Sequence, residues 1–393
     1  MFALSVNYFS TCRDESCTGG NPFEKECMHM KKRVNGCRVG MAAALILLLT
    51  MAGCSPAGQA GLKEADTRLS GKETQTAGQA DMEPVSKEVF AMDTYMTLTA
   101  YGDRADEALD TAEEEINRIE SLLSTGIDTS EISQINRTGE AQVSGDTACL
   151  IERSKELYKD TGGIFDITIY PVMKAWGFTD QNYRIPGQDE LDALLANMGA
   201  DQISLAGDRV KVEKEGMEID LGGIAKGYTS ERVMEIFKEY GIEHAVVSLG
   251  GNVQTLHDKP DGSAWRVAVE DPENTSSYIG VLSVKDKAVI TSGGYERYFE
   301  EDGQTYHHII DPATGYPARS GLTSVTVVSE DGTLADGLST SLFIMGRDRA
   351  ETYWKDHRDL FDMILVEEDG SVSVTDGIAD AFDSEKKWKL IGE

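Results

Sequence analysis

The segment from Asp220 to Tyr228, with the sequence Asp-Leu-Gly-Gly-Ile-Ala-Lys-Gly-Tyr, carries the strongest chemical signal in the chain. Its adjacent glycines, Gly222 and Gly223, allow backbone conformations and a close ligand approach that other residues prevent. Apolar residues at helical spacing follow Lys226, so the pattern predicts a strand, a turn and a helix that stops at Gly241. A helix N-terminus of this kind presents free N–H groups and a positive dipole end, which suit a phosphate. The alternative is a plain strand–helix connection.

Asp336 and Thr340 form a second candidate site, on a predicted helix that ends before Gly346. Residues four apart lie on the same face of a helix, so the carboxylate and the hydroxyl point in one direction. Oxygen ligands of this kind suit Mg²⁺, with phosphate and water completing the coordination shell. The sequence has no His/Cys cluster typical of zinc. The alternative is that Asp336 is a helix N-cap beside a buried threonine.

A third candidate segment, Gly163-Ile164-Phe165-Asp166, places an aromatic ring next to a carboxylate, and Trp176 follows it ten residues later. Phe165 and Trp176 are candidates to stack on a ligand ring, and Asp166 is a candidate to accept a hydrogen bond from it. The alternative is that both rings belong to the core, where aromatic side chains bury most area.

Two histidines, His307 and His308, precede an Asp-Pro…Gly turn. Neighbouring residues of a strand face opposite ways, so at most one of the two histidines points into a given site. A histidine near a phosphate can act as an acid or a base near neutral pH. Arg297, after a Thr-Ser-Gly-Gly bend, could meet a phosphate or an internal carboxylate. The alternative for the histidines is a turn with polar flanks.

The N-terminal region has the order of a secretory signal peptide. Four basic residues precede the apolar run 41–50, which is too short to span a bilayer, and Ala-Gly-Cys54 follows it. A cysteine in this position resembles a bacterial lipobox, which implies cleavage before Cys54 and lipid on its sulfur; the alternative is an ordinary signal peptide. Met1, Met28 and Met30 are possible translation starts. We therefore expect a lipid-anchored protein on the outer face of the cell membrane.

The rest of the chain divides by composition. Residues 1–53 comprise an upstream extension and the signal peptide, 54–86 the lipidated cysteine and a flexible linker poor in large apolar residues, and 87–393 one domain. The net charge of −31 argues against nucleic acid and against charge-driven binding to anionic lipid. Contact with the membrane is therefore expected through the anchor alone.

Helical and strand patterns are interspersed in this domain. An apolar stripe predicts an amphipathic helix over 103–124, and a second helix is expected over 146–159. The short strands have hairpin-like spacing, which predicts an α+β fold with a mostly antiparallel sheet and helices to one side. The expected strands are 95–101, 245–249, 265–269, 279–284, 288–291, 323–328 and 363–366.

Taken in order, these segments resemble the ApbE-type FAD:protein FMN transferases, over about residues 88 to 390. The resemblance implies a single T-fold-like α+β domain, and lipoprotein members are common in the family. The motifs that carry it are Met92-Asp-Thr94, Ser130 to Asn136, Gly163 to Thr168 with Trp176-Gly-Phe178, Asp220 to Tyr228, Ser248-Leu-Gly-Gly-Asn252, Thr291 to Tyr295, His308 to Gly315 and Ala335 to Thr340.

The resemblance also implies a reaction. A threonine or serine hydroxyl of an extracytoplasmic protein attacks the pyrophosphate of FAD, FMN becomes esterified to that residue, and AMP leaves. Mg²⁺ would be held by Asp336, Thr340 and the backbone carbonyl of Gly223, and His308 would activate the hydroxyl or protonate AMP. The residues that the resemblance assigns to FAD are Met92, Ile164, Phe165, Asp166, Asp220, Lys226 and Ile310.

The implied acceptors are flavoprotein subunits of membrane redox complexes, of the NqrC and RnfG types. Two other functions remain open: hydrolysis of FAD to FMN and AMP, and a non-catalytic FAD-binding lipoprotein. The chain departs from the family pattern at two glycines. Gly126 stands where many members have a tyrosine that stacks on FAD, so another aromatic supplies that contact or the affinity is lower. Gly294 stands where the bend often has aspartate.

Overall fold

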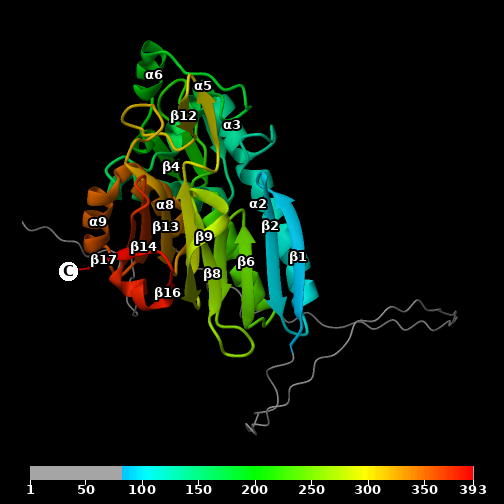
Figure 1. Cartoon of the computed structure of the whole chain (residues 1–393). Coiled ribbons are helices and arrows are strands. Elements are labelled where there is room, and N and C mark those ends of the chain that lie inside the picture. The colour runs from blue at the N-terminus through cyan, green and yellow to red at the C-terminus, as the bar shows by residue number, and fades with distance from the viewer. Residues whose placement is uncertain (1–81, 393) are drawn as a thin grey trace, which may run out of the picture. The chain divides into compact units, whose positions relative to one another are not determined.

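The computed structural model describes residues 82–392 (Figure 1). The expected signal peptide and Cys54 lie outside the described residues, as does most of the expected linker. The domain begins with strand β1 at Pro84, slightly before the start expected at Lys87. Among the described helices, none is long and apolar enough to cross a membrane.

A nine-stranded sheet forms the centre of the domain, in the order β1-β2-β6-β7-β10-β13-β14-β15-β17. Neighbouring strands pair antiparallel except β15 and β17, so the predicted mostly antiparallel sheet is confirmed. The strands are β1 (Pro84–Ala91), β2 (Thr94–Tyr101), β6 (His244–Leu249), β7 (Asn252–Leu256), β10 (Ala288–Gly293), β13 (Leu322–Ser329), β14 (Phe361–Glu367), β15 (Val372–Thr375) and β17 (Trp388–Ile391).

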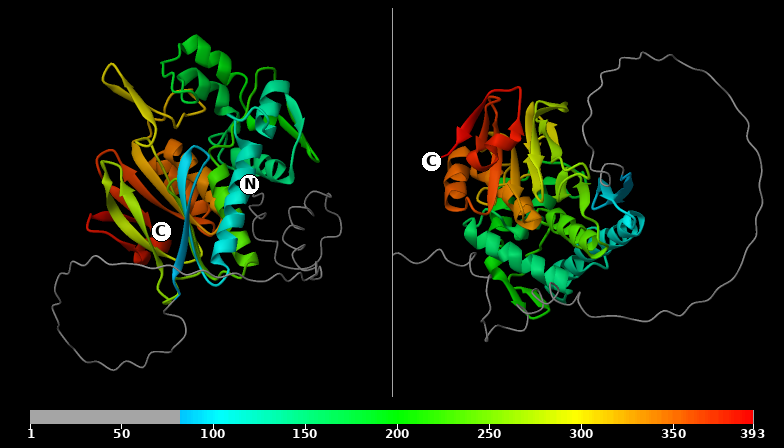
Figure 2. Two further views of the ribbon diagram at one scale, coloured as in Figure 1. Left: turned by 90° about the vertical axis from the view of Figure 1, so that its right-hand side faces the viewer. Right: turned by 90° about the horizontal axis from the view of Figure 1, so that it is seen from below.

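Three helices pack on one face of this sheet (Figure 2, left). Helix α2 (Ala105–Leu123) covers β1 and β2, α7 (Ala225–Glu239) covers β6 and β7, and α8 (Gly332–Met345) covers β10 and β13. The apolar stripe of α2 is buried against the strands, as its periodicity predicts. The helices therefore lie to one side of the sheet, as expected.

The other face is covered in part by a second sheet, which the sequence pattern did not reveal. Strands β8 (Trp265–Asp271), β9 (Asn274–Val284) and β16 (Phe382–Asp383) form this three-stranded sheet. Its apolar residues form one cluster with side chains from β10, β13, β14 and β15. The domain is thus a helix layer, a large sheet and a smaller sheet.

The remaining elements form a further part of the domain, at the top of Figure 1. A three-stranded sheet, β3-β5-β4, and the hairpin β11–β12 belong to it. Helix α4 carries the second predicted helix, within one or two residues of the expected ends. These elements are α3 (Glu131–Thr138), β3 (Glu140–Gln142), α4 (Gly145–Asp160), α5 (Tyr170–Trp176), α6 (Gln188–Leu195), β4 (Ile203–Ala206), β5 (Arg209–Val212), β11 (Tyr298–Glu301) and β12 (Gln304–His307), with α9 (Arg347–Asp356) packed beside α8.

Candidate active site

The glycine turn after Asp220 leads directly into helix α7. The Oδ1 atom of Asp220 accepts a hydrogen bond from the Gly222 amide at 2.8 Å, and the amide of Ala225 bonds the carbonyl of Leu221. Helix α7 begins at Ala225 without a side-chain cap, and Lys226 lies in its first turn. The predicted turn and helix are confirmed, but the predicted strand before the turn is wrong, because residues 217–220 form no strand. The helix start keeps the amide-rich, positive end that attracts anions.

Asp336 is buried in helix α8 and is bound to two other segments of the site. Its Oδ2 accepts a hydrogen bond from the Gly227 amide at 2.8 Å, and its Oδ1 accepts one from Nδ2 of Asn252 at 3.0 Å. The N-cap of α8 is Asp331, whose side chain accepts from the Leu334 amide. Asp336 is therefore no helix cap, and the N-cap interpretation of this residue is wrong.

Helices α7 and α8 touch at a point where only glycine fits. A β-carbon at Gly227 would lie 2.2 Å from the carbonyl oxygen of Gly332 and 2.7 Å from Cβ of Asp336. Both distances are well below van der Waals contact, so the close approach depends on the missing side chain. The contact brings the start of α7 and the carboxylate of Asp336 together.

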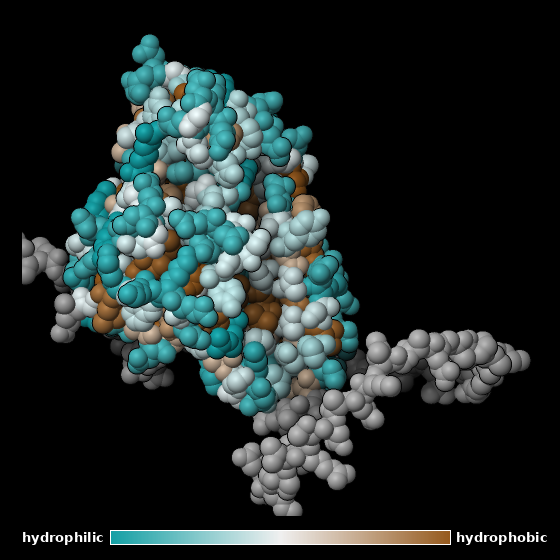
Figure 3. Space-filling model, in the orientation of Figure 1, coloured by the Kyte–Doolittle hydropathy of each residue, from teal (hydrophilic) through white to brown (hydrophobic). Residues whose placement is uncertain are grey.

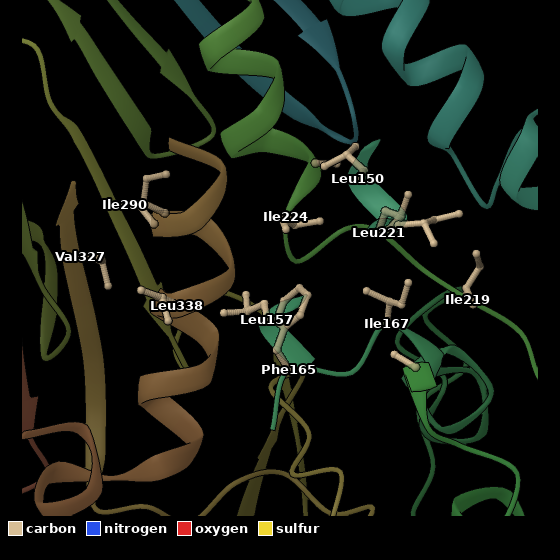
Figure 4. Packing of buried hydrophobic residues seen from close by; sticks show 14 of the residues in the cluster. Leu150, Leu157, Phe165, Ile167, Ile219, Leu221, Ile224, Ile290, Val327 and Leu338 are labelled. Carbon is tan, nitrogen blue, oxygen red and sulfur yellow. The ribbon is translucent and has the colours of Figure 1, made fainter. Parts of the chain in front are cut away.

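Phe165 joins the glycine turn to helix α8. A β-carbon at Gly223, like one at Gly337, would lie 3.4 Å from Cε2 of the Phe165 ring. Figure 4 shows the ring beside Leu157 and close to α8. Phe165 is 5% exposed, so it is mainly a core residue whose ring supports the floor of the site.

Two of the oxygen ligands proposed for a metal, from Asp336 and Thr340, lie one turn apart on helix α8. Asp336 forms no salt bridge within the described residues, and its two hydrogen bonds come from neutral donors, the Gly227 amide and Nδ2 of Asn252. Thr340 lies one turn further along α8, half-buried, with its Oγ1 at 3.3 Å from Oγ of Ser292. A buried carboxylate without a cationic partner, beside a hydroxyl and an exposed glycine turn, fits a hard divalent cation.

Asp166 and Asp220 have raised pKa values. Burial is the main cause for both carboxyl groups, and hydrogen bonds oppose it: from Thr168 to Asp166, and from the Gly222 amide to Asp220. Asp166 Oδ1 accepts from both the amide and the hydroxyl of Thr168, and the Asp220 amide bonds the carbonyl of Ile167. The two acidic segments expected to bind FAD are thus tied together at the backbone.

His307 is the last residue of strand β12 and His308 follows the strand, so the expectation that both histidines lie in one strand is wrong for His308. The two side chains have different surroundings. Nδ1 of His308 lies 3.2 Å from the carbonyl oxygen of Arg297, whose guanidinium in turn donates to the carbonyl of Phe178. Because a carbonyl only accepts, Nδ1 carries the proton and Nε2 keeps its lone pair. Burial and the charge of Arg297 lower the pKa of His308, so the imidazole is neutral at pH 7.

The structure gives a physical reason for Gly294. A β-carbon there would lie 2.9 Å from Cδ2 of His307. The His307 ring packs edge-on against Phe343, and its Nε2 bonds the carbonyl of Ala318 at 3.0 Å. The His307 imidazole therefore fills the space that a side chain at position 294 would need, and an aspartate there would fit only if the imidazole moved. Gly126 lies exposed in the loop between α2 and α3, and nothing in the structure explains its substitution.

Two of the aromatic and apolar candidates belong to the core. Trp176 is fully buried, and its Nε1 donates to the carbonyl of Gly315 at 2.7 Å, so it offers no ring face to a ligand. Ile310 is buried in the same cluster and bridges Pro317. Both hold the Asp311 turn, which follows His308, against helix α5. Ile164, just before Phe165, is half-buried.

Met92 occupies the tight turn between β1 and β2. Both turn residues, Met92 and Asp93, have left-handed backbone angles, with φ of 51° and 57°. The Met92 amide donates to Glu120 at 2.6 Å, and its sulfur lies 3.8 Å from the hydroxyl of Thr229 in α7. The turn is therefore held beside the first turns of α7, next to the site.

Two residues near Asp336 were not assigned a role from the sequence. Asn252 orients the Asp336 carboxylate. It ends the motif Ser248-Leu-Gly-Gly-Asn252, in which the two glycines were the only sequence signal of a site. Glu296 follows the Ser-Gly-Gly bend, and loss of water contact raises the pKa of its carboxyl; Lys226 opposes the rise, while Glu270 and Asp336 add to it. Glu296 thus lies within electrostatic reach of Lys226 and Asp336.

Fold and site together define an α+β domain in which a glycine turn and a buried carboxylate share one helix N-terminus. The model of the ApbE family matches residues 92–365. The chain belongs to the ApbE family.

Named relatives and solved structures agree with this assignment. The FAD:protein FMN transferase of Treponema pallidum is 30% identical over 326 residues, which cover 77% of this chain and 90% of the relative. The FAD:protein FMN transferase of Vibrio cholerae is 31% identical over 336 residues, covering 83% and 94%. The crystal structure of the ApbE protein of Thermotoga maritima superposes with a TM-score of 0.72 at 32% identity, covering 78% of this chain and 100% of that one. The predicted α+β ApbE fold is confirmed.

Proposed function

We propose that this chain is an FAD:protein FMN transferase that uses Mg²⁺ to transfer FMN from FAD to a threonine or serine hydroxyl of an extracytoplasmic protein. Membership of the ApbE family and the names of the relatives support the transferase activity. The observation that supports the Mg²⁺ dependence is the buried Asp336, which is bound to the start of α7 and to Asn252 and has no salt-bridge partner among residues 82–392.

The reaction is a phosphoryl transfer, in which positioning and charge neutralisation do most of the work. The acceptor oxygen forms a bond to the FMN phosphorus, the bond from that phosphorus to the oxygen of AMP breaks, and the hydroxyl proton is lost. Asp336, Thr340 and the carbonyl of Gly223 would hold Mg²⁺, which supplies positive charge at the pyrophosphate. Lys226 and the first amides of α7 would face the same phosphates.

The residues assigned to FAD come from four neighbouring segments. Met92 reaches the site from the β1–β2 turn, Phe165 and Asp166 lie beneath the glycine turn, and Asp220 and Lys226 flank it. Ile164 would add an apolar contact, whereas Ile310 is buried in the core beside Trp176. His308 would accept the proton of the attacking hydroxyl at Nε2, because its Nδ1 is engaged by a carbonyl.

The test of the reaction is mass spectrometry of an RnfG-type acceptor domain incubated with FAD, Mg²⁺ and the described domain. We expect an FMN-sized adduct on a threonine or serine, absent without enzyme or without Mg²⁺. His308→Ala is expected to lower transfer by about 10²–10⁴-fold, the usual contribution of a proton-transfer group, with FAD affinity nearly unchanged.

The pH profile gives an independent check on His308. The pKa of His308 is lowered, so the imidazole stays neutral in mild acid. As the pH is lowered, the loss of transfer rate caused by protonation of His308 should therefore be centred at a pH below about 6.5, the ordinary pKa of histidine. A fall centred at or above that value would contradict the assignment. Free FMN and AMP with an unmodified acceptor would instead establish the FAD hydrolase, and FAD binding without turnover would establish the non-catalytic lipoprotein.

We also propose that the protein is anchored to the outer face of the cell membrane through lipid on Cys54. The basic, apolar, Ala-Gly-Cys order of the N-terminal sequence motivates this proposal. Stable attachment needs two acyl signals or more, so Cys54→Ser should release the protein into the soluble fraction. Fractionation and intact-mass measurement of the mature N-terminus check this prediction. A Cys54→Ser protein that stays in the membrane with the same N-terminus would contradict it.

A further inference from the structure

The surface of the domain does not by itself indicate a further binding site. On the face drawn in Figure 3, apolar residues lie among hydrophilic ones, as they do on most folded proteins. Polar groups beneath the candidate active site are a more specific signal, because a buried polar group keeps hydrogen-bond partners and those partners fix its orientation.

Three hydroxyl side chains meet where strand β10 packs on helix α8. Oγ of Ser292 lies 2.7 Å from Oγ of Ser339 and 3.3 Å from Oγ1 of Thr340. Ser339 is fully buried, and Ser292 and Thr340 are half-buried. Thr340 is one of the proposed metal ligands. The two serines lie in motifs that the sequence marked, but neither has been given a role.

The strand pattern of β10 explains why Ser292 faces helix α8. Successive residues of a strand point to opposite faces of the sheet. Ile290, two residues before Ser292, belongs to the same apolar cluster as Leu338 of α8, and Figure 4 shows both side chains. Thr291 points to the other face, where its Oγ1 lies 2.7 Å from Oγ1 of Thr326 on β13. The hydroxyl of Ser292 is therefore directed at the helix by the register of the strand.

The direction of each hydrogen bond in this group follows from the number of hydrogens. A hydroxyl has one hydrogen to donate, and a backbone carbonyl can only accept. Oγ of Ser339 donates to the carbonyl of Asp336 at 2.8 Å, so its hydrogen is used there. Ser292 must then be the donor in its bond with Ser339, which uses the hydrogen of Ser292. In the remaining bond, Thr340 donates to Ser292.

This direction leaves the oxygen of Thr340 with its lone pairs unused by the two serines. A hydroxyl binds a cation through a lone pair, and a hydrogen aimed at the cation would oppose binding. The next residue of α8 behaves differently: Ser341 donates to the carbonyl of Gly337, four residues back, at 2.7 Å, which is a common bond for a helical serine. Thr340 thus differs from its neighbour in giving its hydrogen to another element.

We propose that Ser292 and Ser339 are positioning residues for the metal ion, which hold the hydrogen of the Thr340 hydroxyl so that its lone pairs are free for the cation. This proposal rests on the Mg²⁺-dependent function proposed above. The two serines act through Thr340, as residues behind a metal ligand commonly do. Their hydrogen bonds end at the backbone of Asp336, so they also join the two side-chain ligands to each other.

Removal of the Ser292 hydroxyl takes away the acceptor of the Thr340 hydrogen. The hydroxyl of Thr340 is then free to turn its hydrogen toward the cation or to bond to a helix carbonyl. We expect Ser292→Ala to weaken binding of a divalent cation about tenfold, at the low end of the effects of removing a group that orients a metal ligand. Ser339→Ala should act in the same direction but less strongly, because Ser292 can still accept from Thr340.

The test is a titration of Mn²⁺ into the FAD-loaded protein without acceptor, with free Mn²⁺ followed by electron paramagnetic resonance. Mn²⁺ takes the same oxygen ligands as Mg²⁺, and this measurement needs no turnover. Ser341→Ala is the matched control, because Ser341 is fully buried on the same helix and its hydroxyl bonds only within that helix. The control should bind Mn²⁺ like wild type. Thermal melting verifies that all variants are folded.

A double-mutant cycle with Thr340→Ala separates positioning from a general structural effect. If Ser292 acts through the Thr340 hydroxyl, the variant Ser292→Ala/Thr340→Ala should bind Mn²⁺ no more weakly than Thr340→Ala alone. Independent contributions would add instead. Wild-type affinity in Ser292→Ala, or additive losses in the double variant, would therefore overturn the proposal.

Failure of the proposed function gives a different result. Wild-type protein that binds Mn²⁺ and forms no adduct on the acceptor would contradict the transferase, while the affinities of the variants would still decide the role of the two serines. Wild-type protein that binds no Mn²⁺ would overturn both the metal site and the positioning role.

Discussion

Asp336→Ala is expected to lower FMN transfer by at least about 10²-fold while FAD still binds. The substitution removes the only charged group among the proposed Mg²⁺ ligands, and a metal ion contributes several kcal/mol to stabilising transition-state charge. The hydrogen bonds from the Gly227 amide and from Asn252 would be lost as well. FAD affinity persists because Met92, Asp220 and the other assigned residues are unchanged.

A second substitution separates the charge of Asp336 from its structural contacts. Asp336→Asn keeps an oxygen that can accept from the Gly227 amide, so it should fold like wild type and yet lose transfer. Thr340→Ala should have a smaller effect, because water can replace a neutral ligand. The measurement is the rate of adduct formation after treatment with EDTA and titration with Mg²⁺. Wild-type rates for Asp336→Ala under these conditions would show that Asp336 holds no catalytic metal.

Gly227→Ala is expected to damage both stability and activity, although alanine is the better helix former. The new methyl group would lie 2.2 Å from the carbonyl oxygen of Gly332, which is backbone and cannot turn away. Helices α7 and α8 must therefore separate, and overpacking of this kind costs typically 1–3 kcal/mol. Because the Gly227 amide also binds Asp336, the separation should move the carboxylate away from the glycine turn and lower transfer.

Chemical denaturation and transfer assays check this prediction together. Gly126→Ala is the matched control, since a β-carbon there meets only Oγ of Ser124 at an ordinary 3.6 Å. The control should lose little stability. If Gly227→Ala unfolded at the wild-type denaturant concentration and transferred FMN at the wild-type rate, the tight crossing of the two helices would have no role in the site.

Local patterns predicted the elements whose periodicity is strong. The apolar stripe of α2 and the helix after Lys226 have the predicted type and nearly the predicted ends, because one face of each is buried and the other is solvated. Strand β1 was not predicted, and its first three residues, 84–86, were assigned to the linker. Its residues from Pro84 to Glu88 are exposed or half-buried, so little apolar alternation marks that half of the strand. The same feature leaves β1 available as an edge.

The pairing of distant segments could not be predicted from spacing. Gly227 and Asp336 are 109 residues apart, and Asn252 and Asp336 are 84 apart, so no local pattern relates them. The resemblance to the family placed these motifs in one site, and the structure supplies the contacts that join them. Trp176 is a residue for which the motif suggested a ligand contact and the structure shows a core position. Its side chain is fully buried, because the indole closes the core beneath the Asp311 turn.

The turn at Met92 and Asp93 has a consequence for attempts to make this protein more heat-resistant. Two-residue hairpins of this type favour Asn-Gly, whereas here two larger residues adopt left-handed angles, at a cost of roughly 1–2 kcal/mol per residue. Replacing the turn by Asn-Gly would relieve that strain but remove the sulfur that lies against Thr229. Met92 is one of the residues proposed to hold FAD. Selection for thermal resistance would therefore oppose selection for that proposed contact, and a library screened only by melting temperature would discard Met92 first.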